Sequence, residues 1–199
     1  MSLEKFAFGN EKLGFERHGL LNTTYGLLSE VKTMVHSTAI ANEFIARAQR
    51  DKKPLTQMQV QKLVYIAHGW NLAINGEPLT HDPIHAWDYG PVYPDLWDSL
   101  KVYGKRPVER RIKIRDFGFG ILMDNSEEEV QAEGLPEESL AVIDQVYESY
   151  SDFKAFQLSA LTHQSDTPWH KVFVQDQLRR GPISDQLIKQ HFLDLARNS

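Results

Sequence analysis

Apolar residues recur at helical spacing in several parts of this 199-residue chain. In the clearest series they follow one another at steps of three and four, at Val60, Leu63, Val64, Ala67 and Ile74. Such spacing places them on one face of an amphipathic helix. Thr56 can cap the first turn. Asn75 and Gly76 supply a left-handed cap at the end, and Pro78 blocks continuation. A helix over residues 57–74 is therefore predicted.

Shorter apolar series predict further helices. Four of these predicted helices begin near residues that are suited to a first turn. These residues are Ser37 or Thr38, Pro94, Pro136 and Ser184. The predicted ranges are residues 38–49, 95–103, 137–150, 155–163 and 185–195.

One segment has a strand pattern instead. Residues 110–123 alternate Ile112 and Ile114 with charged neighbours before becoming apolar, which predicts a short strand or hairpin. The expected fold class is mainly α, more fully α+β with a small β hairpin, built as a compact single-domain helical bundle.

Glycines interrupt every apolar run in residues 1–33. We expect these residues to be an N-terminal extension, either an arm or a non-native leader, ahead of a domain at residues 34–199.

Composition excludes several classes of protein. The chain has no cysteine, so disulfides, a cysteine nucleophile and cysteine-bound zinc are ruled out. A formal net charge of -5 gives no overall attraction to nucleic acid. No apolar run approaches the roughly 20 residues that span a bilayer, and residues 1–12 lack the pattern of a secretory signal. We expect a cytoplasmic protein without membrane association.

Neither a metal nor a cofactor is expected. His81 and His85 have the four-residue spacing of paired zinc ligands on a helix, but Pro83 between them disrupts such a helix. No glycine-rich phosphate loop is present. The nearest pattern, FGFG at residues 117–120, lacks both the spacing and the following helix.

His163, Ser165 and Asp166 supply the residue types of a hydrolytic triad. The G-x-S-x-G elbow is missing, and the surrounding sequence THQSDTPW is typical of a helix end followed by a turn. We favour a structural role in which His163 forms a hydrogen bond that holds the turn at Trp169. No catalytic residue is expected, and a hydrolase ranks last among the hypotheses.

The basic cluster of the chain is KRPVERRIKIR, residues 105–115. Arginines along a strand can follow a phosphate backbone. Charges on an edge strand also prevent sheets from pairing, and this interpretation is favoured. A nucleic-acid-binding, phage-associated regulator that uses residues 105–115 stays as the alternative function.

The turn at residues 85–97, HAWDYGPVYPDLW, is unusually rich in aromatic residues. Its large rings are Trp87, Tyr89, Tyr93 and Trp97. Gly90 permits a backbone conformation closed to other residues and Pro91 fixes the next angle, so the turn is expected to be stiff. So tight a turn cannot bury every ring. We expect some rings to pack on the long helix through Tyr65 and Trp70, and others to be exposed as anchors for a partner.

This turn and the helix before it resemble the Panacea-domain family, which includes SocA-like antitoxins and phage-associated GepA-like proteins. The markers are Gln61, Lys62, Leu63, Tyr65, Gly69, Trp70, Pro78, Leu79, Ala86, Trp87, Gly90, Pro91, Val92, Pro94, Tyr103 and Gly104. LSALTHQSDTPW, residues 158–169, matches the family's C-terminal pattern. The resemblance covers roughly residues 40–192. The sequence departs from the family pattern at His85, where the family often has an acidic residue, and at Trp97, where a tyrosine is common.

The resemblance implies a mainly helical antitoxin that neutralises a co-encoded toxin by direct contact. Some members instead deliver the toxin to a protease. We therefore expect a cognate toxin encoded by an adjacent gene as partner, with a protease as a further one, and no nucleic acid. The residues expected to form or frame the binding surface are Tyr65, Trp70, Trp87, Tyr89, Gly90, Pro91, Tyr93, Trp97, His163 and Trp169.

Overall fold

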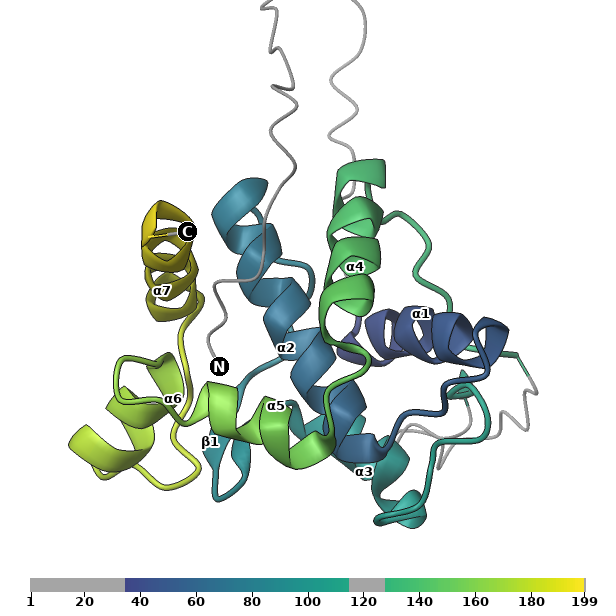
Figure 1. The fold of residues 1–199 in the computed structure, drawn as a ribbon, viewed down its shortest axis with the longest axis horizontal. Coiled ribbons are helices and arrows are strands. Elements are labelled where there is room, and N and C mark those ends of the chain that lie inside the picture. Colours follow the sequence, from purple (N-terminus) through teal and green to yellow (C-terminus); the bar gives the residue numbers. More distant parts are fainter. Residues whose placement is uncertain (1–34, 115–127, 199) are drawn as a thin grey trace, which may run out of the picture.

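The computed structural model describes residues 35–114 and 128–198. This part of the chain is mainly α-helical with one antiparallel hairpin, which confirms the predicted fold class (Figure 1). The helices are α1 (Ser37–Arg50), α2 (Gln57–Ile74), α3 (Pro94–Leu100), α4 (Glu137–Tyr150), α5 (Ala155–Thr162), α6 (Pro168–His170) and α7 (Asp185–Asn198). The strands are β1 (His85–Trp87) and β2 (Gly90–Val92). A 3-10 turn, Lys101–Tyr103, follows α3, and a π-helical turn, Lys171–Gln175, follows α6. Not one of the described helices has the length and apolar character needed to cross a bilayer.

Helix α2 is the centre of the bundle. It contacts α1, α3, α4, α5 and α7. Figure 1 shows it between α4 and α7. The apolar pattern predicted one buried face, but residues 60–72 of α2 are buried on all sides, and even Gln61 and Lys62 are only 2% and 1% exposed. Ile74, the last residue of the predicted apolar face, is 43% exposed. The pattern underestimated burial because neighbouring elements also cover the polar positions of α2.

Helix α7 packs on α2 through an aromatic ring. Gly69 of α2 has no side chain, and a Cβ atom there would overlap the ring of Phe192. That ring meets Trp70 and Tyr65 edge-on, with centroid distances of 5.2 Å and 6.2 Å. Tyr65 and Trp70 were expected to pack on the aromatic turn. Both contact α7 through Phe192. Tyr65 also lies close to Tyr93 of the turn, whose pKa is raised first by burial and further by nearby groups that include Tyr65. The absence of a side chain at Gly69 is what lets the two helices approach this closely.

The ends of α2 follow the sequence signals. Thr56 Oγ1 accepts a hydrogen bond from the Gln59 backbone N–H at 3.4 Å, and Gln59 Oε1 accepts one from the Thr56 backbone N–H at 2.9 Å. These reciprocal bonds form a capping box. At the other end Gly76 adopts a φ of +80°, whereas Asn75 stays in the helical region. The left-handed cap therefore belongs to Gly76 alone.

The start of α1 differs from the prediction. Neither Ser37 nor Thr38 caps the helix, because Ser37 already lies in its first turn. The Ser37 backbone N–H and Oγ instead donate to the Asp82 carboxylate at 2.8 Å and 2.6 Å. A distant loop thus supplies the acceptor. The prediction for α7 is confirmed, since Ser184 Oγ accepts a hydrogen bond from the Leu187 backbone N–H at 3.3 Å.

The hairpin lies earlier in the chain than predicted. Of the expected strand at residues 110–123, residues 115–123 lie outside the described residues, as do residues 1–33. Residues 110–114 form a single bridge, between Lys113 and Glu129. Among the described residues, no second strand pairs with Ile112 on its other side; the buried side-chain amide of Asn42 in α1 binds its backbone there. The amide donates to the Ile112 carbonyl at 2.9 Å and accepts from the Ile112 N–H at 2.7 Å.

Candidate partner-binding site at the hairpin

The aromatic turn folds as the β1–β2 hairpin. Ala86 pairs with Pro91 and Trp87 pairs with Gly90. The other edge of β1 is also occupied, because Ala86 donates to the Gly181 carbonyl at 2.9 Å and accepts from the Arg180 N–H at 2.7 Å. A segment that follows α6 in sequence therefore fixes the hairpin from outside.

Helix α2 holds β2 through two buried polar side chains. The Gln61 amide accepts from the Tyr93 N–H at 3.1 Å and donates to the Tyr93 carbonyl at 3.2 Å. Lys62 Nζ donates to the Pro91 carbonyl at 2.9 Å. Neither residue was expected to form the site, although both stand among the family markers. Polar residues within an apolar helical series are normally assigned to its solvent face, which hid their role.

Side chains near α5 and α6 hold the tip of the hairpin. Trp169 Nε1 donates to the Trp87 carbonyl at 2.8 Å, and Ser159 Oγ donates to the Tyr89 carbonyl at 3.2 Å. The His163 ring lies 3.8 Å from the Trp169 ring between centroids, and its Nε2 is 3.4 Å from the Asp88 carbonyl oxygen. His163 therefore supports Trp169 by ring contact, where a hydrogen bond had been expected.

Glycine is required at position 90 both by the backbone conformation and by the limited space around its Cα atom. Its φ of +104° is a conformation that residues with side chains rarely adopt. A Cβ atom there would lie 2.7 Å from both Lys62 Nζ and Thr162 Oγ1. The hairpin can therefore rest directly on α2 and α5 only with glycine at this position.

The predicted rings divide between core and surface. Tyr93 is fully buried and Trp169 is 6% exposed, whereas Tyr89 is 71% exposed. Trp87 and Trp97 are half-buried, and their rings lie 5.5 Å apart. The same hairpin thus combines buried anchoring rings with accessible ones.

A pocket of about 290 Å³ opens beside the two tryptophans. Its lining includes Lys62, Trp87, Tyr89, Val92, Trp97 and Arg180. We call it the tryptophan pocket. The Arg180 guanidinium lies 4.8 Å from the centre of the Trp87 ring, and Lys101 Nζ lies 5.4 Å from that of Trp97. Both are within the range of cation–π attraction. Burial lowers the pKa of Lys62 to about 7.

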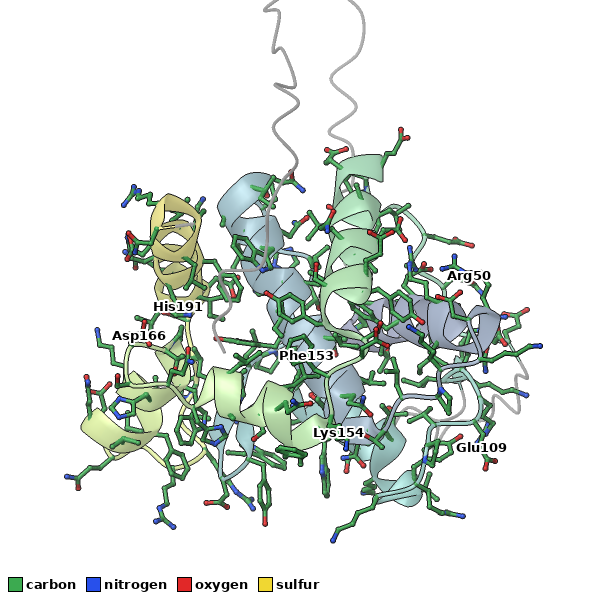
Figure 2. All side chains as sticks on the ribbon, in the orientation of Figure 1. Arg50, Glu109, Phe153, Lys154, Asp166 and His191 are labelled. Atoms are coloured by element: carbon green, nitrogen blue, oxygen red, sulfur yellow. The ribbon has the colours of Figure 1, made fainter. Side chains whose placement is uncertain are left out.

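The residues of the hydrolase hypothesis do not assemble. The His163 ring nitrogens face the backbone carbonyls of Ser159 and Asp88, and Ser165 is exposed. Asp166 lies towards His191 of α7 (Figure 2), where its charge opposes the lowering of the His191 pKa by burial. Within residues 35–114 and 128–198, no group of three or more metal-ligating side chains is close enough to hold an ion.

Part of the basic segment is neutralised within the chain. Arg111 forms a salt bridge of 2.9 Å with Glu129. Arg106 donates to the Val102 carbonyl at 3.2 Å, while Arg115 lies outside the described residues. The Arg111–Glu129 salt bridge therefore offsets part of the positive charge of the segment.

Comparison with known proteins assigns the chain to a family. Residues 60–170, more than half of the chain, match the family described as antitoxin SocA-like, Panacea domain. The chain belongs to this SocA-like antitoxin family. Antitoxin SocA of Caulobacter vibrioides (strain NA1000 / CB15N) is 28% identical over 176 residues, which cover 83% of this chain and 86% of the relative. No solved structure matches the chain.

The part that matches the Panacea domain contains most of the site. It starts in α2 at Val60 and ends at His170, so Lys62, the hairpin and Trp169 all lie within it. Arg180 and α7 follow it in sequence. The tryptophan pocket of this SocA-like protein therefore combines side chains from inside and outside the matched part.

Proposed function

We propose that this protein is an antitoxin that neutralises a cognate toxin by direct contact, and that the hairpin carries the docking surface. Membership of the SocA-like antitoxin family supports the antitoxin role. The observation that carries the docking surface is a hairpin fixed by side chains from α2, α5 and α6 that still leaves Tyr89 71% exposed.

The docking surface extends from the hairpin to α5. Phe156 of α5 is 67% exposed, and it lies on the same helical face as Ser159, which binds the Tyr89 carbonyl. We define the hairpin face as Trp87, Tyr89, Trp97 and Phe156. Large aromatic side chains of this kind are typical anchors of protein interfaces.

Rigidity makes this face suited to binding. Association costs free energy whenever loops and side chains must become ordered. Here the carbonyls of Trp87, Tyr89 and Pro91 are already engaged by side chains of the helical body, so the hairpin backbone has little left to order. More of the free energy from burying Tyr89 and Phe156 then contributes to affinity.

Co-expression with the adjacent gene product in the cytoplasm tests the proposal. The wild-type chain should restore growth and co-purify with the toxin. A double Tyr89→Ala, Phe156→Ala variant should lose both effects while keeping its circular dichroism spectrum, because both side chains are exposed. Val174→Ala removes another exposed apolar side chain, 47% exposed on the π-helical turn, and should behave as wild type. A wild-type chain that neither rescues growth nor forms a complex would contradict the antitoxin role.

The mode of neutralisation has its own readout. We propose steric occlusion as the primary mode, with delivery to a protease as a further step. Occlusion leaves the half-life of the toxin unchanged after translation is blocked, whereas delivery shortens it only when antitoxin and protease are both present. A pulse-chase measurement in strains with and without the protease separates the two modes.

A further inference from the structure

The tryptophan pocket contains a buried lysine amine that has no carboxylate partner in the described part of the chain. Lys62 is 1% exposed, and its Nζ donates to one acceptor, the Pro91 carbonyl. A lysine ammonium has three N–H donors, so two lack a strong acceptor. No carboxylate in the described part of the chain forms an ion pair with it. Since burial disfavours the charged form and lowers the pKa of Lys62, an anion brought into the pocket would gain a strong charge-assisted hydrogen bond.

Two residues of the pocket lining carry further donors. Trp87 Nε1 is buried and has no acceptor among the described residues. Arg180 lies over the Trp87 ring without a salt bridge in that part of the chain, at a strained backbone φ of 61°. Its N–H is bonded to the Ala86 carbonyl, which fixes its position. Asp88, which is exposed, is the acidic residue of the lining. The lining thus contains two basic side chains, Lys62 and Arg180, and one acidic side chain, Asp88.

We propose that the tryptophan pocket receives a carboxylate of the bound toxin, from an Asp or Glu side chain next to an apolar residue that packs on Trp87 and Trp97. This inference rests on the proposed function. The carboxylate would accept from Lys62 Nζ and pair with Arg180. The neighbouring apolar side chain would cover the two indole rings.

The size of the pocket agrees with this occupant. Its volume of about 290 Å³ is many times the roughly 30 Å³ share of one water molecule. It lies just below the range of about 300–1,000 Å³ for pockets that enclose a whole small ligand. One or two side chains of a partner protein fit such a volume better than a large cofactor does.

Binding of the toxin from the adjacent gene, measured by calorimetry, tests the role of Lys62. Lys62→Met keeps the length of the side chain but removes the donor, and should weaken binding by at least about tenfold, because charge-assisted hydrogen bonds are worth roughly 1.5–3 kcal/mol. Arg180→Gln should weaken it less. Lys189→Met, at a half-buried position on α7 whose lysine donates to the Gly76 carbonyl, is the matched control and should bind as wild type. A folded Lys62→Met variant with wild-type affinity would overturn the inference and leave the antitoxin role intact.

The toxin supplies the second half of the test. Each of its Asp and Glu residues is changed to Asn or Gln and combined with Lys62→Met in a double-mutant cycle. One toxin variant should weaken binding to the wild-type antitoxin by about tenfold or more and have little further effect on Lys62→Met. If none shows this coupling, the carboxylate does not occupy the pocket.

A peptide probe tests the pocket even if the toxin does not bind. N-acetyl-Phe-Glu amide and N-acetyl-Phe-Gln amide differ only in the carboxylate. The Glu peptide should shift the Trp87 indole N–H resonance in a ¹H–¹⁵N spectrum at millimolar concentration, and the Gln peptide should not. Equal shifts, or no shift with either peptide, would count against a carboxylate site.

Discussion

The α2–α7 contact and the hairpin are attached to the same helix by different forces. Helix α7 packs through the ring of Phe192, which covers Gly69 and touches Tyr65 and Trp70. The hairpin is attached mainly by directional hydrogen bonds from Lys62 and Trp169 to its backbone carbonyls. Apolar packing is non-directional and contributes most of the free energy of folding. Hydrogen bonds contribute less in net terms but define orientation.

Under the proposed function, this contrast separates the contacts that stabilise the fold from those that position the hairpin face. The stability of the helical body depends on the volume and shape of its packed side chains. The hairpin face, by contrast, needs particular donors at particular distances. Changes at the two contacts should therefore affect different measurements, with unfolding free energy responding at α7 and partner affinity responding at the hairpin.

The largest loss of stability is expected for Phe192→Ala. Removing this fully buried ring leaves a cavity over Gly69 and should lower the free energy of unfolding by about 3–5 kcal/mol. Urea denaturation followed by circular dichroism measures the change. Leu187→Ala, at a partly buried position on the same helix, is the control and should cost less. A loss below about 1 kcal/mol for Phe192→Ala would refute the role given to α7.

An intermediate effect is expected for Gly90→Ala, compared with Gly104→Ala. Both glycines have positive φ values, +104° and +55°, so each alanine pays a backbone strain of about 1–3 kcal/mol. Only at Gly90 does the new Cβ atom also meet Lys62 Nζ and Thr162 Oγ1. The end of the lysine can move away, but it then loses its bond to the Pro91 carbonyl. Gly90→Ala should therefore be the less stable variant, by about 1–3 kcal/mol.

The Gly90 comparison also has a binding readout. The Gly90→Ala variant should bind the toxin more weakly, because the added Cβ atom displaces the hairpin. The Gly104→Ala variant should bind the toxin normally once folded, because the space around Gly104 is open. Equal affinities for the two folded variants would show that the exact position of the hairpin does not matter for binding.

The most gradual effect is a dependence of stability on pH. In the unfolded chain Lys62 keeps its proton up to about pH 10.4, whereas in the folded chain burial lowers its pKa to about 7. Between these values the unfolded state binds more protons, so raising the pH favours the folded state by up to about 1.4 kcal/mol per unit. Below pH 7 Lys62 is protonated in both states, so it does not make the free energy of unfolding depend on pH.

Unfolding of wild type and Lys62→Met from pH 7 to pH 9 tests this expectation. The charged groups that line the same pocket, Asp88 and Arg180, are present in both proteins, so the difference between the two curves isolates Lys62. The free energy of unfolding of the wild type should rise with pH relative to that of Lys62→Met. Parallel curves would show that the ammonium keeps an ordinary pKa in the folded chain.

Local signals allowed much of the fold to be predicted from the sequence. The capping box at Thr56 joins residues three positions apart, and Ser184 caps α7 over the same distance. The cap of α1 was missed because its acceptor, Asp82, lies 45 residues from Ser37. The hairpin was recognised as a stiff turn and not as paired strands. Strands of three residues are too short to show alternation, and Pro91 lacks the N–H that a ladder normally uses.

The candidate site could be located only in part. Dense aromatic residues marked the turn, and Gly90 and Pro91 marked its stiffness. Which rings face inward depends on contacts between distant segments, so Tyr89 and Tyr93 could not be told apart. The roles of Lys62 and Arg180 depend on tertiary contacts with the hairpin, and no pattern within either segment predicts them.

The pairing of Arg180 and Gly181 with Ala86 has one more consequence. It occupies the edge of β1 that does not pair with β2, so a partner cannot extend the sheet there by adding a strand of its own. Strand addition depends on the main chain and tolerates many sequences. Contact with β1 must instead be made through side chains, which ties recognition to the amino acids that the partner presents.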